Sequence, residues 1–220
     1  MRGFSERLEV LRRIDSLIDF SRATAQLRIL VALNTAVLSV DEIVERTSLR
    51  RKTVLDALRK LELKGLVERV DGRYRLSRRG RAVYDALRSI LTGDVVGAPH
   101  VPSVKPVLYD SYEELLSVVY MLRALKVIGL RRRPYPLSKL AKKLGVSAEA
   151  LDSHLKRFTT PRLPILRRIA AERGVVYTAT ELGQRLYRML YAKTPRSVLA
   201  KLLHRIAKGI RFLVARVTGY

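Results

Sequence analysis

The sequence predicts a mostly α-helical protein with small β wings, an α+β fold in which one plan of helices and hairpin occurs twice. One observation is an apolar pattern that recurs at residues 40–61 and 137–158, at a constant offset of 97 positions. Each copy is followed by a hairpin signal and another helix. The chain also carries 44 Lys and Arg against 20 Asp and Glu, a formal net charge of +24. We therefore expect two small folded units in one strongly basic chain.

Both copies of the apolar pattern have the spacing of two short helices joined by a turn. Seven apolar positions coincide without a gap: Val40, Ile43, Val44, Leu49, Val54, Leu58 and Leu61 in the first copy, and Leu137, Leu140, Ala141, Val146, Leu151, Leu155 and Phe158 in the second. Leu58 and Leu155 are the one identical pair. The copies therefore share the positions of their apolar residues but not the residue identities.

Boundary signals define the helices of the first unit. We expect a helix over about residues 23–33, then a helix that begins after Ser39, because Ser39 and Glu42 form a capping box. The following helix, over about residues 50–64, should end at Gly65. Glycine readily adopts the left-handed conformation that follows many helices.

An Asp-Gly pair between two strand-like runs predicts a hairpin in the first unit, because both central residues of a type I′ turn need a positive φ. Pairing outward from this turn sets Val70 opposite Arg73, Arg69 opposite Tyr74, Glu68 opposite Arg75 and Val67 opposite Leu76. In this register Val67 and Leu76 dock on the core. Ser77 then caps a closing helix that extends to about residue 91.

The second unit repeats this plan with longer loops. Ser111 and Glu114 should cap a helix that extends to about residue 128. Paired helices and the strands of a wider hairpin, with a five-residue loop, are expected at residues 138–144, 147–158, 165–169 and 175–179. A last helix starts after Thr180.

Composition separates the two units. Residues 93–110 hold two Gly and three Pro without a sustained period, which is typical of an extended linker. From residue 193 onward the chain has seven basic and no acidic residues, and Pro195 suits the first position of a helix. We thus expect an N-terminal amphipathic helix (1–20), a first domain (21–92), a linker (93–110), a second domain (111–192) and a C-terminal basic amphipathic helix (193–220).

Helix, helix-turn-helix, two-stranded wing and closing helix, in this order, resemble the winged-helix family of DNA-binding domains. The most specific stretch is 49–80, LRRKTVLDALRKLELKGLVERVDGRYRLSRRG. It is similar to the recognition helix, Gly-Leu-Val strand start and wing of archaeal and bacterial winged-helix transcription regulators. The second unit lacks Gly-Leu-Val and has two prolines at that place. The resemblance implies two tandem winged-helix domains that bind DNA, the second more divergent.

The first unit is expected to read the bases. The buried stripe of its second helix leaves an outer face of Lys52, Asp56, Arg59 and Leu63, and the N-terminal part of such a helix enters the major groove. Asp56 lies four residues from both Lys52 and Lys60, so we expect it to form helix ion pairs and not a base contact. The DNA-binding candidates of this unit are Arg50, Arg51, Lys52, Thr53, Arg59 and Lys60 on the helix, and Arg69, Arg73, Arg75 and Arg78 on and after the wing.

The second unit is expected to grip phosphates. Its matching helix face, with Glu149, Ser153 and Lys156, is nearly neutral. Positive charge lies instead on the preceding helix and around the wing, which favours phosphate contacts over base readout. The candidates here are Lys139, Lys142, Lys143, Lys156, Arg157, Arg167, Arg168 and Arg173.

Several function classes are disfavoured. Cys is absent and the three His are far apart in sequence, which excludes a zinc finger and predicts no metal site. There is no phosphate-binding loop and no catalytic triad pattern, so we expect neither an enzyme nor a cofactor. No apolar run approaches bilayer length and no signal peptide is evident, which predicts a cytoplasmic, nucleoid-associated protein without membrane contact. The composition leans toward that of thermophiles.

Double-stranded DNA is the expected partner, because the strong positive charge attracts polyphosphate. The N-terminal helix has an apolar stripe of Phe4, Leu8, Leu11, Ile14 and Ile18. It either packs on its own domain or forms a homodimer, in which the C-terminal helix could also take part. A transcription or replication protein is a further candidate partner.

We expect a sequence-specific transcription regulator. A replication-origin initiator that resembles the eukaryotic licensing factor is an alternative, because archaeal initiators of that kind also carry paired winged-helix domains. A structural protein of chromatin or the ribosome is a third. The residue patterns do not distinguish among these three functions.

Overall fold

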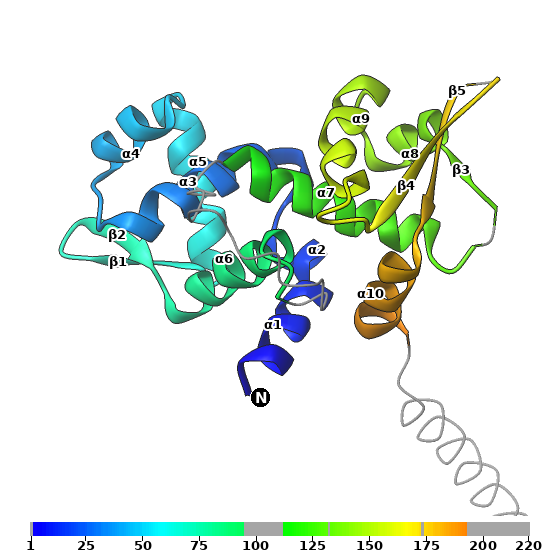
Figure 1. Cartoon of the computed structure of the whole chain (residues 1–220). Helices are drawn as coiled ribbons and strands as arrows, with labels where there is room; N and C mark the ends of the chain where they lie inside the picture. The colour runs from blue at the N-terminus through cyan, green and yellow to red at the C-terminus, as the bar shows by residue number, and fades with distance from the viewer. Residues whose placement is uncertain (1, 95–111, 132, 173, 193–220) are drawn as a thin grey trace, which may run out of the picture. The chain divides into compact units, whose positions relative to one another are not determined.

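The computed structural model describes residues 2–94, 112–131, 133–172 and 174–192. The chain divides into a large unit, Met1–Leu190, and a second unit, Tyr191–Tyr220. The described residues are mostly helical, with two small antiparallel sheets (Figure 1). The expected α+β fold is therefore confirmed. Most of the linker predicted for 93–110, the Ser111 cap and the helix predicted for 193–220 lie outside the described residues.

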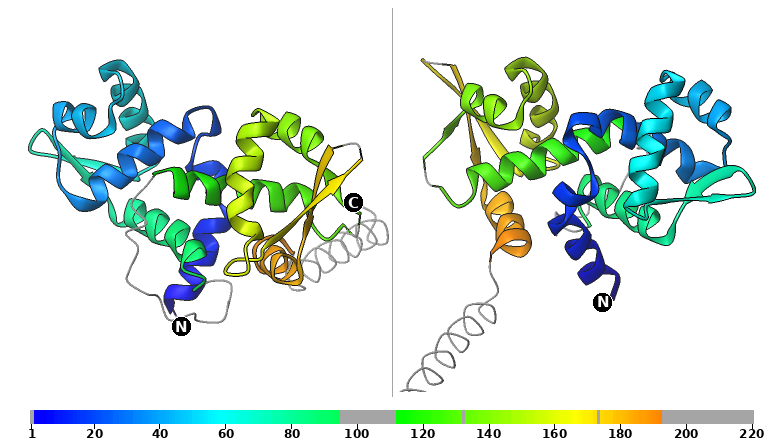
Figure 2. Two further views of the ribbon diagram at one scale, coloured as in Figure 1. Left: turned by 45° about the horizontal axis from the view of Figure 1, so that its top comes forward. Right: turned by 180° about the vertical axis from the view of Figure 1, so that it is seen from behind.

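Apart from the Phe4 side chain, which lies outside the part of the chain that is described, the N-terminal apolar stripe packs inside the chain. α1 (Arg2–Arg12) is followed by α2 (Ile14–Leu17) and by a 3-10 turn, η1 (Phe20–Arg22). α1 packs against α6 (Arg78–Leu91) (Figure 2). Leu11, Ile14 and Ile18 are buried and Leu8 is half-buried. Packing on the chain's own domain, one of the two alternatives for this stripe, accounts for these side chains, and dimerisation stays a prediction.

The helices of the first copy begin and end close to the predicted residues. They are α3 (Ala23–Thr35), α4 (Val40–Thr47) and α5 (Arg51–Leu63). Both hydrogen bonds of the capping box between Ser39 and Glu42 are present at the start of α4. Gly65, after α5, has a φ of 65°. Capping and glycine signals thus located the helix boundaries because both act through adjacent backbone.

The first wing has the predicted register. β1 (Val67–Val70) and β2 (Arg73–Leu76) pair antiparallel, with all four expected residue pairs. The two turn residues between them have φ values of 50° and 79°. Val67 and Leu76 are buried in the core, as expected. A single bridge from Leu38 to Tyr74 adds a third partner that was not predicted.

The second copy follows the same order after α7 (Tyr112–Ile128). A short strand, β3 (Tyr135–Pro136), precedes α8 (Leu137–Leu144), α9 (Ala148–Lys156) and a 3-10 turn, η2 (Arg157–Thr159); then come β4 (Leu166–Ala171), β5 (Gly174–Ala179) and α10 (Glu181–Tyr191). The five-residue hairpin loop is wrong, because pairing continues to Ala171 and Gly174. α7 contacts α3 and α6 of the first copy and α8 and α9 of the second (Figure 2).

The same arrangement of hydrogen bonds is present at the start of the last helix in both copies. In the first, the Ser77 hydroxyl accepts from the Gly80 backbone N–H, and the Ser77 N–H donates to the Leu66 carbonyl. In the second, Thr180 makes the same bonds with Gly183 and Ile165. A Cβ on either glycine would overlap the carbonyl oxygen of Leu66 or Ile165. Both positions therefore require glycine because the closing helix approaches the strand so closely.

Candidate nucleic-acid interface

α5 presents a mixed basic and apolar face to solvent. Its buried side is Val54, Ala57, Leu58 and Leu61. On the opposite side Lys52 and Arg59 are exposed, together with Leu55, which is 44% exposed, and Leu63, which is 79% exposed. No ion pair involves Lys52 or Arg59 among the residues that the structure describes. Their charges are available to a partner.

The N-terminus of α5 is partly engaged. Arg50 is exposed at the N-cap position, and the Arg51 guanidinium pairs with the Asp41 carboxylate of α4. Thr53 is half-buried. Lys52 and Thr53 line an open groove of about 760 Å³, whose other wall includes Tyr120, Gly145 and Val146 of the second copy.

Asp56 is an ion-pair partner, as expected, but not of Lys52 or Lys60. Its carboxylate accepts a hydrogen bond of 2.9 Å from Arg22 in η1, and this bond lowers the pKa of Asp56. Lys60 donates instead to Asp19 at 2.6 Å. That bond, followed by one from Ser21, holds the pKa of the Asp19 carboxyl well below its usual range. The segment before α3 therefore neutralises two charged groups of α5, which sequence spacing within the helix did not reveal.

The same segment also binds α7. Asp15 accepts from Lys126 at 2.6 Å, and the Arg123 guanidinium lies 3.5 Å from the centre of the Phe20 ring. Residues 15–22 thus connect α5 of the first copy with α7 of the second. Part of the segment that was predicted as a terminal helix therefore links two other helices of the chain through side-chain contacts.

The arginines of the first wing differ in their partners. Arg73 donates to both carboxylate oxygens of Glu42, at 2.8 and 2.7 Å, and Arg75 donates to Glu68 at 2.6 Å. Arg69 has no carboxylate partner in the described part of the chain and lies 5.8 Å from the centre of the Tyr74 ring. Exposed pairs of this kind are weak, so phosphates can replace the carboxylates.

In the second copy, a buried carboxylate holds the wing against α9. Asp152 accepts from Arg168 at 2.9 and 3.1 Å, from the Tyr177 hydroxyl at 2.7 Å, and pairs with Lys156 at 3.1 Å. The Arg168 bond is the main cause that lowers the pKa of Asp152 to about 2. Burial, then the bond to Asp152, raises the pKa of Tyr177. Arg168 and Lys156, both predicted DNA contacts, therefore already take part in holding the fold together.

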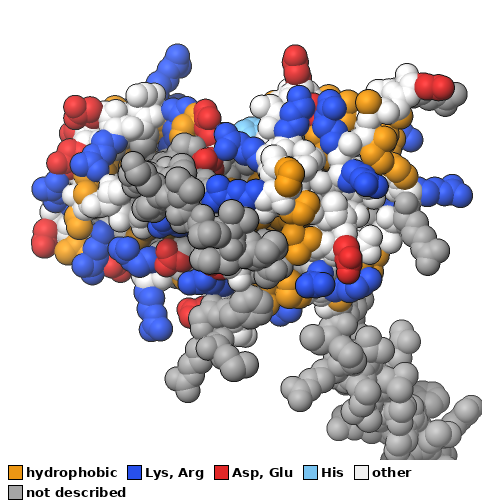
Figure 3. All heavy atoms as spheres, viewed as in Figure 1, with side chains coloured by type: hydrophobic (Ala, Val, Ile, Leu, Met, Phe, Trp, Pro, Cys, Tyr) orange, Lys and Arg blue, Asp and Glu red, His pale blue; other side chains and the backbone are white. Residues whose placement is uncertain are grey.

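The remaining candidates are mostly solvated. Arg157 pairs with Glu114 at 3.3 Å. Arg173 lies outside the described residues. Among the described residues, the predicted DNA contacts that are exposed and lack an ion pair are Arg50, Lys52, Arg59, Arg69, Arg78, Lys139, Lys142, Lys143 and Arg167. We call these nine the unpaired basic set. In Figure 3, Lys and Arg side chains are spread over both copies of the plan.

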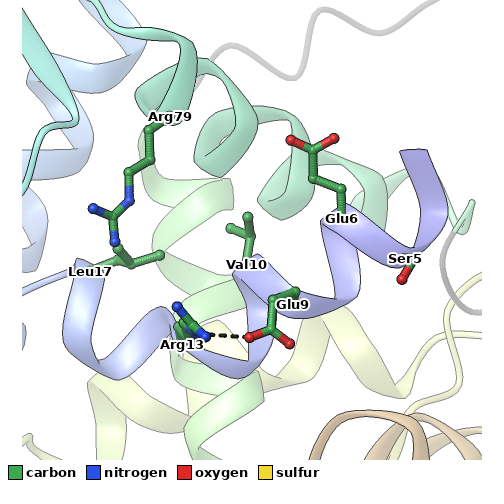
Figure 4. A pocket seen from close by; sticks show the side chains of 7 residues that line it. All are labelled: Ser5, Glu6, Glu9, Val10, Arg13, Leu17 and Arg79. Carbon is green, nitrogen blue, oxygen red and sulfur yellow. Dashed lines mark ion pairs between the residues drawn. The ribbon is translucent and has the colours of Figure 1, made fainter. Parts of the chain in front are cut away.

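A separate pocket does not belong to this surface. It has a volume of about 470 Å³ and lies between α1 and the start of α6, where Glu6, Glu9, Arg13 and Arg79 surround Val10 (Figure 4). Arg13 pairs with Glu9 at 2.8 Å. Two carboxylates on one wall make it unsuited to a nucleic-acid backbone.

Metal-binding clusters and membrane-spanning helices are absent from the described residues. No group of three or more His, Cys, Asp or Glu there could hold a metal ion. Within the same residues, no helix is both long and apolar enough to span a bilayer.

Comparisons with known proteins found one matching family and two similar proteins. The family described as HVO_A0261 N-terminal domain matches residues 10–94, from α1 to just after α6. The HTH-type transcriptional activator ArnR of Sulfolobus acidocaldarius is 35% identical over 158 residues, 70% of this chain and 59% of that protein. The HTH-type transcriptional activator ArnR1 of the same organism is 29% identical over 214 residues, 94% of this chain and 78% of that protein. The chain thus spans about three fifths of the length of ArnR. No solved structure matches the chain significantly.

Proposed function

We propose that this protein regulates transcription by binding specific sequences of double-stranded DNA through two winged-helix domains in tandem. The observation that carries the proposal is the outer face of α5, where Lys52 and Arg59 are exposed and unpaired within the described residues. Side chains of this type donate hydrogen bonds to guanine O6 and N7 in the major groove. The buried side of the same helix fixes their direction.

The tandem arrangement is supported by contacts that recur in both copies. The bridge between Leu38 and Tyr74 corresponds to the pair Tyr135 and Tyr177, since both lie just before a helix-turn-helix and pair with the second wing strand. The closing bonds of Ser77 and Thr180 correspond in the same way. A bridge or short strand beside the wing and a capped closing helix thus occur in both copies, which supports two domains of the winged-helix type.

We infer different roles for the two domains. The first domain reads bases through α5 and its wing. The second domain holds phosphates through Lys139, Lys142 and Lys143 on α8 and through Arg167 on its wing. Positive groups away from the reading helix contribute affinity that depends on salt and not on sequence.

The relatives favour regulation of transcription over the other two functions, because ArnR and ArnR1 are both named as HTH-type transcriptional activators. Neither name mentions replication or a structural role. Genome-wide immunoprecipitation of the full chain tests this choice. We expect peaks at promoters; a peak confined to a replication origin, or even coverage of the genome, would contradict the proposal.

Direct binding gives the second test. The full chain should bind a duplex selected from a random pool at least tenfold more tightly than an unselected duplex, at one stated salt concentration. Equal affinity for selected and unselected duplexes would show a protein without sequence preference.

A further inference from the structure

One apolar side chain stands among the cations of α5. Leu55 is 44% exposed, although most large apolar residues of the described chain are buried. Its neighbours on the helix surface, three and four residues away, are Arg51, Lys52 and Arg59. A single exposed leucine is ordinary on most surfaces. Leu55 differs because it lies in the N-terminal half of the helix that the proposed function places in the major groove.

The charged groups beside Leu55 differ in whether they have an ion-pair partner. Arg51 is held by Asp41, Asp56 by Arg22, and Lys60 by Asp19. Lys52 and Arg59 are the flanking charges without such a partner in the described residues. The face offered to a groove is therefore a cation, a leucine and a cation.

The position equivalent to Leu55 in the second copy has the opposite character. At the offset of 97 it is Asp152, which binds the wing through Arg168. Leu55 has no such bond to make, and Arg69, which occupies the strand position of Arg168 opposite a tyrosine, has no carboxylate partner among the described residues. Leu55 is therefore an exposed apolar side chain at a position where the second copy has a buried carboxylate.

From this surface we propose that Leu55 contacts the C5-methyl group of a thymine in the major groove, so that it determines specificity beside Arg59 and Lys52. This inference rests on the proposed function. Thymine is the one base that presents a methyl group there, and apolar side chains recognise it. Leu55 and Arg59 are one helical turn apart, about 6 Å along α5, which corresponds to about two base steps of 3.4 Å. The preferred sequence therefore contains a thymine within about two base pairs of a guanine read by Arg59.

Replacing thymine with deoxyuridine tests this contact, because it removes only the methyl group. The full chain is first used to select a preferred duplex from a random pool. Each thymine of that duplex is then replaced singly, and affinity is measured by fluorescence anisotropy at fixed salt. One replacement should weaken binding by about fourfold, the value of one buried methyl group.

Two variants identify the side chain responsible. Leu55→Ala should bind the thymine and deoxyuridine duplexes equally. Leu63→Ala is the matched control, because Leu63 is an exposed leucine of the same helix at its C-terminal end. It should keep the fourfold difference. Both leucines are exposed, and equal unfolding midpoints by circular dichroism confirm that the variants are folded.

Four results would overturn the inference. If no single thymine replacement weakens binding, or if Leu55→Ala keeps the difference, the contact is not made, while the proposed function stands. If Leu63→Ala removes the difference, the inference about Leu55 also fails and the proposed function stands. If the chain selects no preferred duplex at all, the proposed function fails and this inference fails with it.

Discussion

α5 and α9 occupy the same place in two copies of one plan, yet their outer faces have different partners. Leu55 of α5 is exposed, whereas Asp152 at the equivalent position of α9 is buried and accepts from Arg168 and Tyr177. The matching wing pair in the first copy is Arg69 and Tyr74, where no carboxylate holds the arginine within the described residues. At this position the second copy thus ties a wing arginine to α9, whereas in the first copy no carboxylate holds the corresponding arginine among the described residues.

This difference supports our proposal that the two copies have different roles. In the second copy, the buried carboxylate of Asp152 secures the wing against α9 and pairs with Arg168 and Lys156, whose side chains stay partly exposed. In the first, Asp19 and Arg22 pair with Lys60 and Asp56 of α5, while Lys52 and Arg59 have no ion pair among the described residues. We infer that the first copy reads DNA and the second grips it.

The largest predicted effect tests whether the two copies really share one plan. Gly80→Ala and Gly183→Ala should each destabilise the protein by about 3 kcal/mol, because the new Cβ would overlap a backbone carbonyl that cannot move freely. Urea unfolding of the full chain measures both. Arg81→Ala, an exposed neighbour of Gly80, should have little effect. A large destabilisation for only one glycine would show that the closing contacts are not equivalent.

The next prediction concerns Asp152 and pH. The folded state lowers its pKa from 3.8 to about 2, so the stabilisation is fully present above pH 4 and disappears as the pH falls toward 2. Asp152→Asn should therefore cost about 2 kcal/mol at pH 7, and the difference from the natural protein should shrink between pH 4 and pH 2. Urea unfolding across this range checks it.

Asp56→Asn provides the matched control in the first copy. Asp56 pairs with a single partner, Arg22, and both side chains are more than a third exposed. We expect a smaller change in unfolding free energy than for Asp152→Asn. For Asp152→Asn, a loss of unfolding free energy that stays constant from pH 7 to pH 2 would contradict the role given to the charge of Asp152.

The proposed phosphate-binding role of the second copy predicts a change in the salt dependence of DNA affinity. Lys142→Ala combined with Lys143→Ala should reduce the slope of log affinity against log salt by about 1.8, two phosphate contacts at about 0.9 each. The ratio of affinities for selected and random DNA should stay the same. A fall in that ratio would mean that α8 contributes to base readout.

The smallest predicted effect comes from replacing Leu55 of α5 with the aspartate that occupies the equivalent position of α9. Leu55→Asp should capture Arg69 as Asp152 captures Arg168, and so reduce the salt slope by about 0.9, one phosphate contact. Adding Arg69→Ala to this variant should change the slope no further. If the two substitutions instead reduce the slope additively, the copies do not use this position in the same way.

Local signals made much of the fold predictable. The register of the first wing followed from the Asp71-Gly72 turn, and the start of α4 followed from Ser39 and Glu42. These features depend on neighbouring backbone, so the sequence specifies them directly. The loop of the second hairpin was predicted too long because no such turn pair marks its tip.

The partners of the charged residues could not be predicted in the same way. Lys60 meets Asp19 across 41 positions, and Arg22 meets Asp56 across 34. Such pairs arise only when distant segments pack, and periodicity within a helix carries no information about them. The repeat aligns Asp152 with Leu55, but the alignment of Arg168 with Arg69 follows only from the strand register of the structure, because the second hairpin loop was predicted too long.

The division of labour is tested most directly by the affinity ratio between a selected duplex and a random duplex. Lys52→Ala with Arg59→Ala should reduce this ratio, by about 1–3 kcal/mol for each side chain that binds a base. Glu149→Ala with Lys156→Ala, the same two positions of α9, should leave it unchanged. Equal reductions for the two double variants, or a reduction only for the pair on α9, would contradict the conclusion that the first copy reads the sequence.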